Sequence, residues 1–171
     1  YADAETVQAQ AAAIRAAISA APMPAEMQSA IVSAYADLGD QPYVAVRSSG
    51  TAEDLEAASF AGQHDTYLDI RGTDAVVDAV KRCWASLWTA RAVAYRQQKG
   101  FDHTEVGIAI VIQTMVASEV SGVMFTANPM TAAVDEIVIN ASYGLGEAIV
   151  SGIVTPDLFV LDRADLHVRR A

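Results

Sequence analysis

Residues 44–55 read VAVRSSGTAEDL, an apolar run that ends in an arginine and continues as a small polar loop. Pro42 precedes the run, and residues 43–46 (YVAV) are short, apolar and bounded by polar residues, which predicts a buried strand. Arg47 stands where this strand leaves the core, so its aliphatic stem must emerge from buried surroundings. The stretch therefore predicts a strand whose last residue, Arg47, lies beside a loop of serine, glycine and threonine.

The Arg47 side chain has two interpretations from the residues alone. Its planar fork of donors matches the oxygens of a phosphate group, and residues 48–51 (SSGT) offer backbone N–H groups and hydroxyls to an anion. The alternative is a structural ion pair with Glu53 or Asp54. The small-residue loop favours phosphate, and both interpretations stay open.

Two helices are predicted before this strand, and helices and further strands after it. Apolar residues recur at helical spacing over residues 2–21, and again from Pro24 to Gly39. Residues 66–70 predict a strand, Thr73 is expected to cap a helix, and another helix is expected over residues 91–98.

The second half of the chain is predicted to be mostly strands. Two apolar, β-branched runs flank a polar link at residues 118–121 and predict a hairpin, and two more strands are expected later. These four runs are residues 108–116, 122–126, 136–141 and 157–161. Helices followed by a run of antiparallel strands indicate the α+β class.

Composition excludes several classes of function. The 171 residues carry 11 Lys+Arg against 21 Asp+Glu, a formal charge of −10, which argues against a nucleic-acid partner. Residues 144–149 (GLGEAI) lack the third glycine of a dinucleotide fingerprint. His64, His103 and His167 have no second ligand at zinc-binding spacing, so we expect no metal ligands in this chain.

The single cysteine indicates the compartment. Cys83 cannot form an intramolecular disulfide, and it lies in an apolar helical pattern, where a buried thiol is expected. No run approaches the ~18 apolar residues that cross a bilayer. We therefore expect a cytoplasmic protein with no membrane segment.

Taken together, these motifs resemble one enzyme family. Residues 44–55 with residues 58–63 (ASFAGQ) are similar to the signature of the nucleotide-binding domain of phosphoenolpyruvate synthase, pyruvate phosphate dikinase and rifampicin phosphotransferase. Other stretches agree in order: residues 84–87 (WASL), 95–96 (YR), 113–116 (QTMV), 121–126 (SGVMFT), 141–147 (ASYGLGE) and 156–157 (PD).

The resemblance implies an ATP-grasp-like domain, incomplete at both ends. The implied subdomains are residues 1–106, with the helices and the Arg47 loop, and residues 107–171, which are β-rich. Such a domain passes the β-phosphoryl group of ATP to a histidine on a separate domain and thence to pyruvate, releasing AMP and phosphate. No histidine here matches the phosphohistidine motif, so the implied partners are that histidine domain and a substrate domain. The implied cofactors are ATP and Mg²⁺. The ligands of Mg²⁺ are expected outside this chain. A lysine of a preceding glycine-rich turn is expected outside it too.

The resemblance also assigns residues. Arg47 is implied as the catalytic, phosphate-binding arginine, and Gly62 and Thr66 flank the segment that closes on the phosphates. Gln113 occupies the adenine-side hinge, where Met115 and Val116 offer backbone groups and an apolar wall to the base.

Two alternatives remain beside phosphoenolpyruvate synthesis. A rifampicin phosphotransferase has a similar nucleotide-binding domain, and a non-catalytic nucleotide-binding or interaction module could keep the fold without the chemistry. We also expect an unpaired strand edge at residues 160–168, through which the chain would self-associate.

Overall fold

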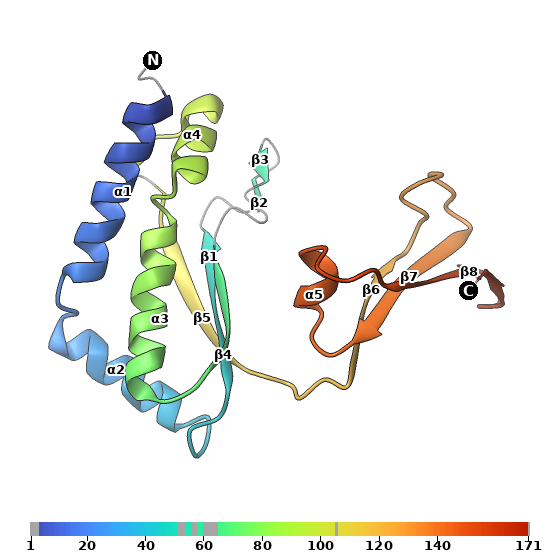
Figure 1. Ribbon diagram of the computed structural model, residues 1–171, viewed down its shortest axis with the longest axis horizontal. Helices are drawn as coiled ribbons and strands as arrows, with labels where there is room; N and C mark the ends of the chain where they lie inside the picture. Colours follow the sequence, from blue (N-terminus) through green and yellow to red (C-terminus); the bar gives the residue numbers. More distant parts are fainter. Residues whose placement is uncertain (1–3, 51–53, 56–57, 60–64, 105, 171) are drawn as a thin grey trace. The chain divides into compact units, whose positions relative to one another are not determined.

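The computed structural model describes every residue except 1–3, 51–53, 56–57, 60–64, 105 and 171. The chain divides into two compact units, Tyr1–Met115 and Val116–Ala171, each with its own sheet (Figure 1). Helices and antiparallel sheets together confirm the α+β class.

Four helices belong to the first unit: α1 (Ala4–Ala20), α2 (Ala25–Ala36), α3 (Thr73–Ser86) and α4 (Ala90–Lys99). The two helices predicted at the start of the chain are confirmed. Helix α3 packs on the sheet and α1 packs on α3 and α4, so the helices cover one face of the sheet (Figure 1).

The ends of α3 and α4 follow local signals, with one correction. Gly72, at φ 89°, precedes α3, and Thr73 is the first helical residue instead of the predicted cap. Thr89 caps α4 by accepting a hydrogen bond from the Ala92 N–H at 3.2 Å. Gly100 ends α4 at φ 74°, a conformation that favours glycine.

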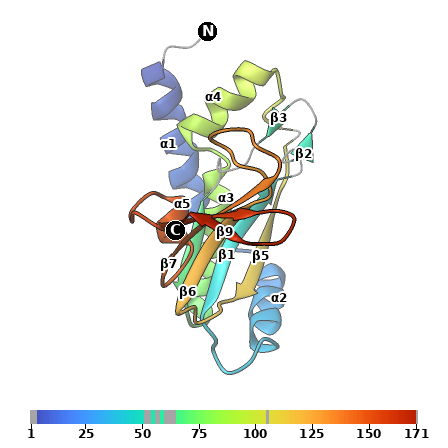
Figure 2. The same ribbon diagram turned by 90° about the vertical axis from the view of Figure 1, so that its right-hand side faces the viewer.

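The sheet of the first unit has the order β4-β1-β5, with all pairs antiparallel. Its strands are β1 (Val44–Gly50), β4 (Thr66–Ile70) and β5 (Ile108–Thr114), and β1 and β5 lie side by side in Figure 2. Two short strands, β2 (Asp54–Leu55) and β3 (Ala58–Ser59), pair with each other.

The predicted hairpin between residues 108–116 and 122–126 is wrong. Strand β5 pairs with β1 along seven residues, and the boundary between the units follows Met115, so β5 belongs with the helical part of the chain. Ile110 and Ile112 pack against the same core as Val44 and Val46. Strand β5 pairs with β1 because this pairing buries Ile110 and Ile112 under the helices. The polar residues 118–121 fit a longer connection between two sheets as well as they fit a hairpin turn.

The core of the first unit lies between the sheet and α3. Val44, Val46, Ala79 and Cys83 have no exposed surface there, and Tyr35 joins them from α2. The prediction that Cys83 is buried is confirmed.

The second unit is a four-stranded antiparallel sheet in the order β6-β7-β8-β9, with one short helix, α5 (Glu147–Val150). Its strands are β6 (Val120–Phe125), β7 (Glu136–Tyr143), β8 (Asp157–Asp162) and β9 (Val168–Arg170). A Cβ on Gly122 would lie 3.0 Å from the Asn140 carbonyl oxygen, so this glycine permits the close approach of β6 and β7.

The edge predicted at residues 160–168 is partly covered. Strand β9 pairs with Val160 and Leu161 of β8, so β8 is an inner strand, and β6 and β9 are the outer strands of the described sheet. Strand β9 was not predicted from the sequence, because it has only three residues and they do not alternate between apolar and polar. Within the described residues, no helix has the length and apolar character to cross a membrane.

Candidate functional site

One face of the β4-β1-β5 sheet is left uncovered by the helices, and we call it the open face. Successive side chains of a strand point to opposite faces, so the burial of Val44 and Val46 under the helices directs Arg47 and Ser49 the other way. Arg47 and Ser49 are accordingly exposed. The open face comprises Tyr43, Ala45, Arg47, Ser49, Thr66, Ala109, Val111, Gln113 and Met115.

Arg47 lies at the centre of this face. It is paired across the sheet with Thr66 of β4 on one side and with Val111 of β5 on the other. A shallow depression of about 250 Å³ is lined by Arg47, Ser48, Ser49, Val111 and Gln113. The depression therefore combines one cation, the Ser49 hydroxyl and one amide, which are groups that bind phosphate oxygens.

The Arg47 guanidinium forms no ion pair with any residue of the described part of the chain. The alternative partner Glu53 and the side chain of Asp54 lie outside that part. Within the described residues, the Arg47 side chain is exposed to solvent at the middle of the sheet.

The residues predicted for the base lie at the end of β5. Met115 donates its N–H to the Tyr43 carbonyl oxygen at 2.8 Å, so this donor is occupied and cannot also bind a base. The Met115 carbonyl oxygen and the Val116 N–H have no hydrogen-bond partner among the described residues. Val116 is 76% exposed and is the first residue of the second unit.

The structure thus brings four of the six predicted site residues to one face: Arg47, Thr66, Gln113 and Met115. Val116 follows directly in the chain, and Gly62 lies outside the described residues. Sequence reasoning missed Tyr43 and Val111 as members of this face. Counting alternate residues from Arg47 along the strand would have found Tyr43.

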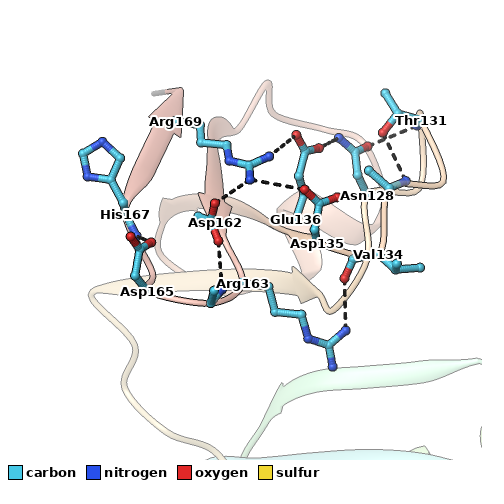
Figure 3. Close-up of polar contacts among 12 residues, drawn as sticks. Asn128, Thr131, Val134, Asp135, Glu136, Asp162, Arg163, Asp165, His167 and Arg169 are labelled. Atoms are coloured by element: carbon cyan, nitrogen blue, oxygen red, sulfur yellow. Dashed lines mark hydrogen bonds and ion pairs between the residues drawn. The ribbon is translucent and has the colours of Figure 1, made fainter.

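A second polar cluster lies in the second unit, around Arg169 of β9 (Figure 3). Its guanidinium donates to Asp135 at 3.2 Å, to Glu136 at 3.1 Å and to Asp162. Hydrogen bonding by Arg169 lowers the pKa of Asp162, and the three carboxylates raise the pKa of Arg169. The cluster connects β9 to β7, to β8 and to the segment before β7.

Within the described residues, no group of three or more histidine, cysteine or acidic side chains could hold a metal ion. His103 accepts a hydrogen bond from the Arg96 Nε at 3.0 Å through its Nδ1. His64 lies outside the described residues.

The chain is similar to proteins of one family over its whole length. Residues 1–171 match the family described as pyruvate phosphate dikinase, AMP/ATP-binding domain. The chain is 55% identical to the probable phosphoenolpyruvate synthase of Pyrococcus abyssi and 54% identical to the phosphoenolpyruvate synthase of Pyrococcus furiosus, in each case over 98% of this chain and 21% of the relative. It is 46% identical to a rifampicin phosphotransferase of Streptomyces over 98% of the chain and 19% of the relative. The chain spans about a fifth of the length of these relatives.

Proposed function

The chain belongs to the family of the pyruvate phosphate dikinase AMP/ATP-binding domain, and on this premise we propose that its open face binds the phosphates of ATP in a phosphoenolpyruvate-synthase-like phosphotransferase. The observation that carries the proposal is the exposed Arg47, which has no ion pair among the described residues and lies beside Thr66, Ser49 and Gln113. The identity to the phosphoenolpyruvate synthases, 54–55% against 46% for the rifampicin phosphotransferase, supports pyruvate as the final acceptor.

The proposed reaction moves the β-phosphoryl group of ATP to a histidine on another domain of the parent protein, while water accepts the γ-phosphoryl group, so that AMP and phosphate are the products. Charge develops on the phosphate oxygens in such a transfer, and fixed cationic donors stabilise it. Arg47 supplies such a donor, and the Ser49 hydroxyl and the Gln113 amide of the depression orient the remaining oxygens. The acceptor histidine and the binding site for the final substrate lie on other domains of the parent protein.

Mg²⁺ accompanies ATP in this chemistry, but within the described residues no group of histidine, cysteine or acidic side chains fits a metal site. The family resemblance, and not this absence, is our ground for proposing that the metal ligands lie in other parts of the parent protein, and we derive no step through the metal. We also propose that the domain has an ATP-grasp fold and that the isolated chain self-associates. A cytoplasmic location is proposed as well, because Cys83 is a free thiol and is buried. Two α+β units that adjoin at Met115 and Val116 support the fold assignment.

The experiment is a single-turnover assay of the complete protein with ATP radiolabelled at the β-phosphorus. Label is expected to appear on the protein in an acid-labile form with release of AMP, and to move to pyruvate when pyruvate is added. Arg47→Ala is expected to slow the transfer by at least about 100-fold.

Three outcomes separate the alternatives. Label that moves to a rifamycin and not to pyruvate identifies the antibiotic phosphotransferase. ATP binding without label transfer identifies a non-catalytic module. Transfer by Arg47→Ala at the wild-type rate refutes the role of Arg47.

A further inference from the structure

Tyr43 presents a half-exposed aromatic ring on the open face. Its side chain is 51% exposed, and the Arg71 guanidinium lies 5.1 Å from the ring centroid. Arg71 is held in this position because its Nε donates to the Gln41 carbonyl oxygen at 2.9 Å. One side of the ring is therefore covered by a fixed cation, while half of the side chain remains accessible to solvent.

Pairs of arginine and aromatic residues are common in proteins, so the contact with Arg71 does not by itself indicate a binding site. The position of the Tyr43 ring on the sheet is the stronger indication. Tyr43 is the cross-strand partner of Met115, as the hydrogen bond from the Met115 N–H to its carbonyl oxygen shows. The two side chains therefore share the face that carries Arg47. Tyr43 thus stands at the hinge end of the face.

The spacing along β1 fits one nucleotide. Tyr43 and Arg47 are four residues apart in an extended segment, which places their Cα atoms ~13 Å from each other on the same face. This separation is of the order of the distance from the base to the terminal phosphates in an extended nucleoside triphosphate. A ligand whose phosphates meet Arg47 can bring its base to Tyr43.

We propose that Tyr43 is the base-stacking residue of the nucleotide site and that Arg71 is the positioning residue that holds its ring. The proposal rests on the proposed function, because it places the base of the nucleotide whose phosphates Arg47 binds. An aromatic ring stacks a purine through its π face, and a cation on the opposite side strengthens such a stack. Stacking requires a base and contributes nothing to the binding of phosphates alone.

This difference defines the experiment, which is titration calorimetry of the complete protein with ATP and, separately, with inorganic tripolyphosphate. Tyr43→Ala is expected to raise the Kd for ATP about tenfold and to leave the Kd for tripolyphosphate unchanged. Tyr43→Phe keeps the ring and is expected to bind ATP as the wild type does. Met27→Ala removes a similarly exposed side chain, 44% exposed, from helix α2 and serves as the matched control.

Arg71→Ala tests the positioning role. It is expected to weaken ATP binding about threefold in the wild-type background and to have no effect in the Tyr43→Ala background, because the ring through which it acts is then absent. An equal loss in both backgrounds contradicts a role through Tyr43.

The outcomes keep this proposal separate from the proposed function. Unchanged ATP affinity in Tyr43→Ala, or an equal loss of affinity for ATP and tripolyphosphate, overturns the stacking role while Arg47 can still bind phosphate. Wild-type affinity of Arg47→Ala for both ligands overturns the proposed function itself. A thermal melt of Tyr43→Ala that matches the wild type excludes misfolding as the cause of weaker binding.

Discussion

Arg96 on α4 is a fully buried cation whose energetics can be tested directly. Its Nε donates to His103 and its guanidinium lies 5.4 Å from the Trp88 ring centroid, but its two terminal nitrogens have no hydrogen-bond partner among the described residues. Burial lowers the pKa of this guanidinium. The side chain therefore contributes packing and a ring contact, while part of its charge remains uncompensated.

We predict that Arg96→Ala lowers the free energy of unfolding by about 3 kcal/mol and that Arg96→Met lowers it by only about 1 kcal/mol. Methionine restores most of the buried volume and removes the desolvated charge. Urea unfolding of both variants measures the difference. Equal losses would show that the charge contacts, and not the packing, hold this position.

Cys83 and Tyr67 make the first unit sensitive to alkaline pH. Burial, together with the nearby Asp65 carboxylate, raises the pKa of the Cys83 thiol from 9.0 to about 11 and that of Tyr67 from 10.0 to about 12. The unfolded chain releases these protons at lower pH than the folded chain does. The stability that both groups contribute is therefore complete below pH 9 and is lost as the pH rises through 11 and 12.

Accordingly, the urea midpoint of the wild type is expected to fall between pH 9 and pH 11. Cys83→Ala is expected to start from a lower midpoint, because it leaves a small void, but to decline less steeply with pH. Parallel declines in the two proteins would show that other groups control the alkaline transition.

At the level of elements, strand β9 is paired with β8 and is also held by the ion pairs of one side chain, Arg169. Arg169 connects this three-residue strand to carboxylates of β7, β8 and the segment before β7 (Figure 3). We predict that Arg169→Ala accelerates hydrogen exchange at the β9 amides and that Arg170→Ala, its neighbour on the same strand, does not. Because Arg169 lowers the pKa of Asp162, the protection is expected to be present at neutral pH and to fall below pH 4 as the carboxylate protonates.

Unchanged exchange in Arg169→Ala would mean that backbone pairing alone holds β9. Exchange that accelerates equally in Arg170→Ala would assign the effect to net charge and not to the Arg169 contacts.

Helices could be predicted from the sequence much better than strand partners. Pro22 and Pro24 separate the first two helices, and Thr89 and Gly100 bound α4, so each boundary depends on neighbouring residues. The partner of β5 depends instead on which distant strand buries the same face, and no local signal carries that information. The period-two pattern of Ile110 and Ile112 gave the strand but not its position in the sheet.

For the molecule as a whole, the candidate site was partly predictable. Arg47 stood out because it ends an apolar strand, and the family resemblance added Thr66 and Gln113. Tyr43 and Arg71 could not be paired from the sequence, since their contact forms only when β4 returns beside β1. The match of the whole chain to the nucleotide-binding family confirms the resemblance itself.

The outer strands of the second unit lead to a prediction about assembly. Strand β6 has one unpaired edge within the described sheet and exposes Val120 and Met124, and β9 is too short to extend the sheet far. We expect the isolated 171-residue chain to self-associate at high concentration through such an edge. Sedimentation velocity should show a concentration-dependent dimer, and a strict monomer across the concentration range would refute the expectation.

We propose that the open face of the β4-β1-β5 sheet binds ATP through Arg47. The most direct test is equilibrium titration of ATP into the complete wild-type protein, into Arg47→Ala and into Arg15→Ala, which removes an exposed cation from helix α1. We expect saturable binding to the wild type, a loss of affinity of about 10- to 100-fold in Arg47→Ala, and no change of affinity in Arg15→Ala. Wild-type affinity for ATP in Arg47→Ala would show that Arg47 does not bind the nucleotide.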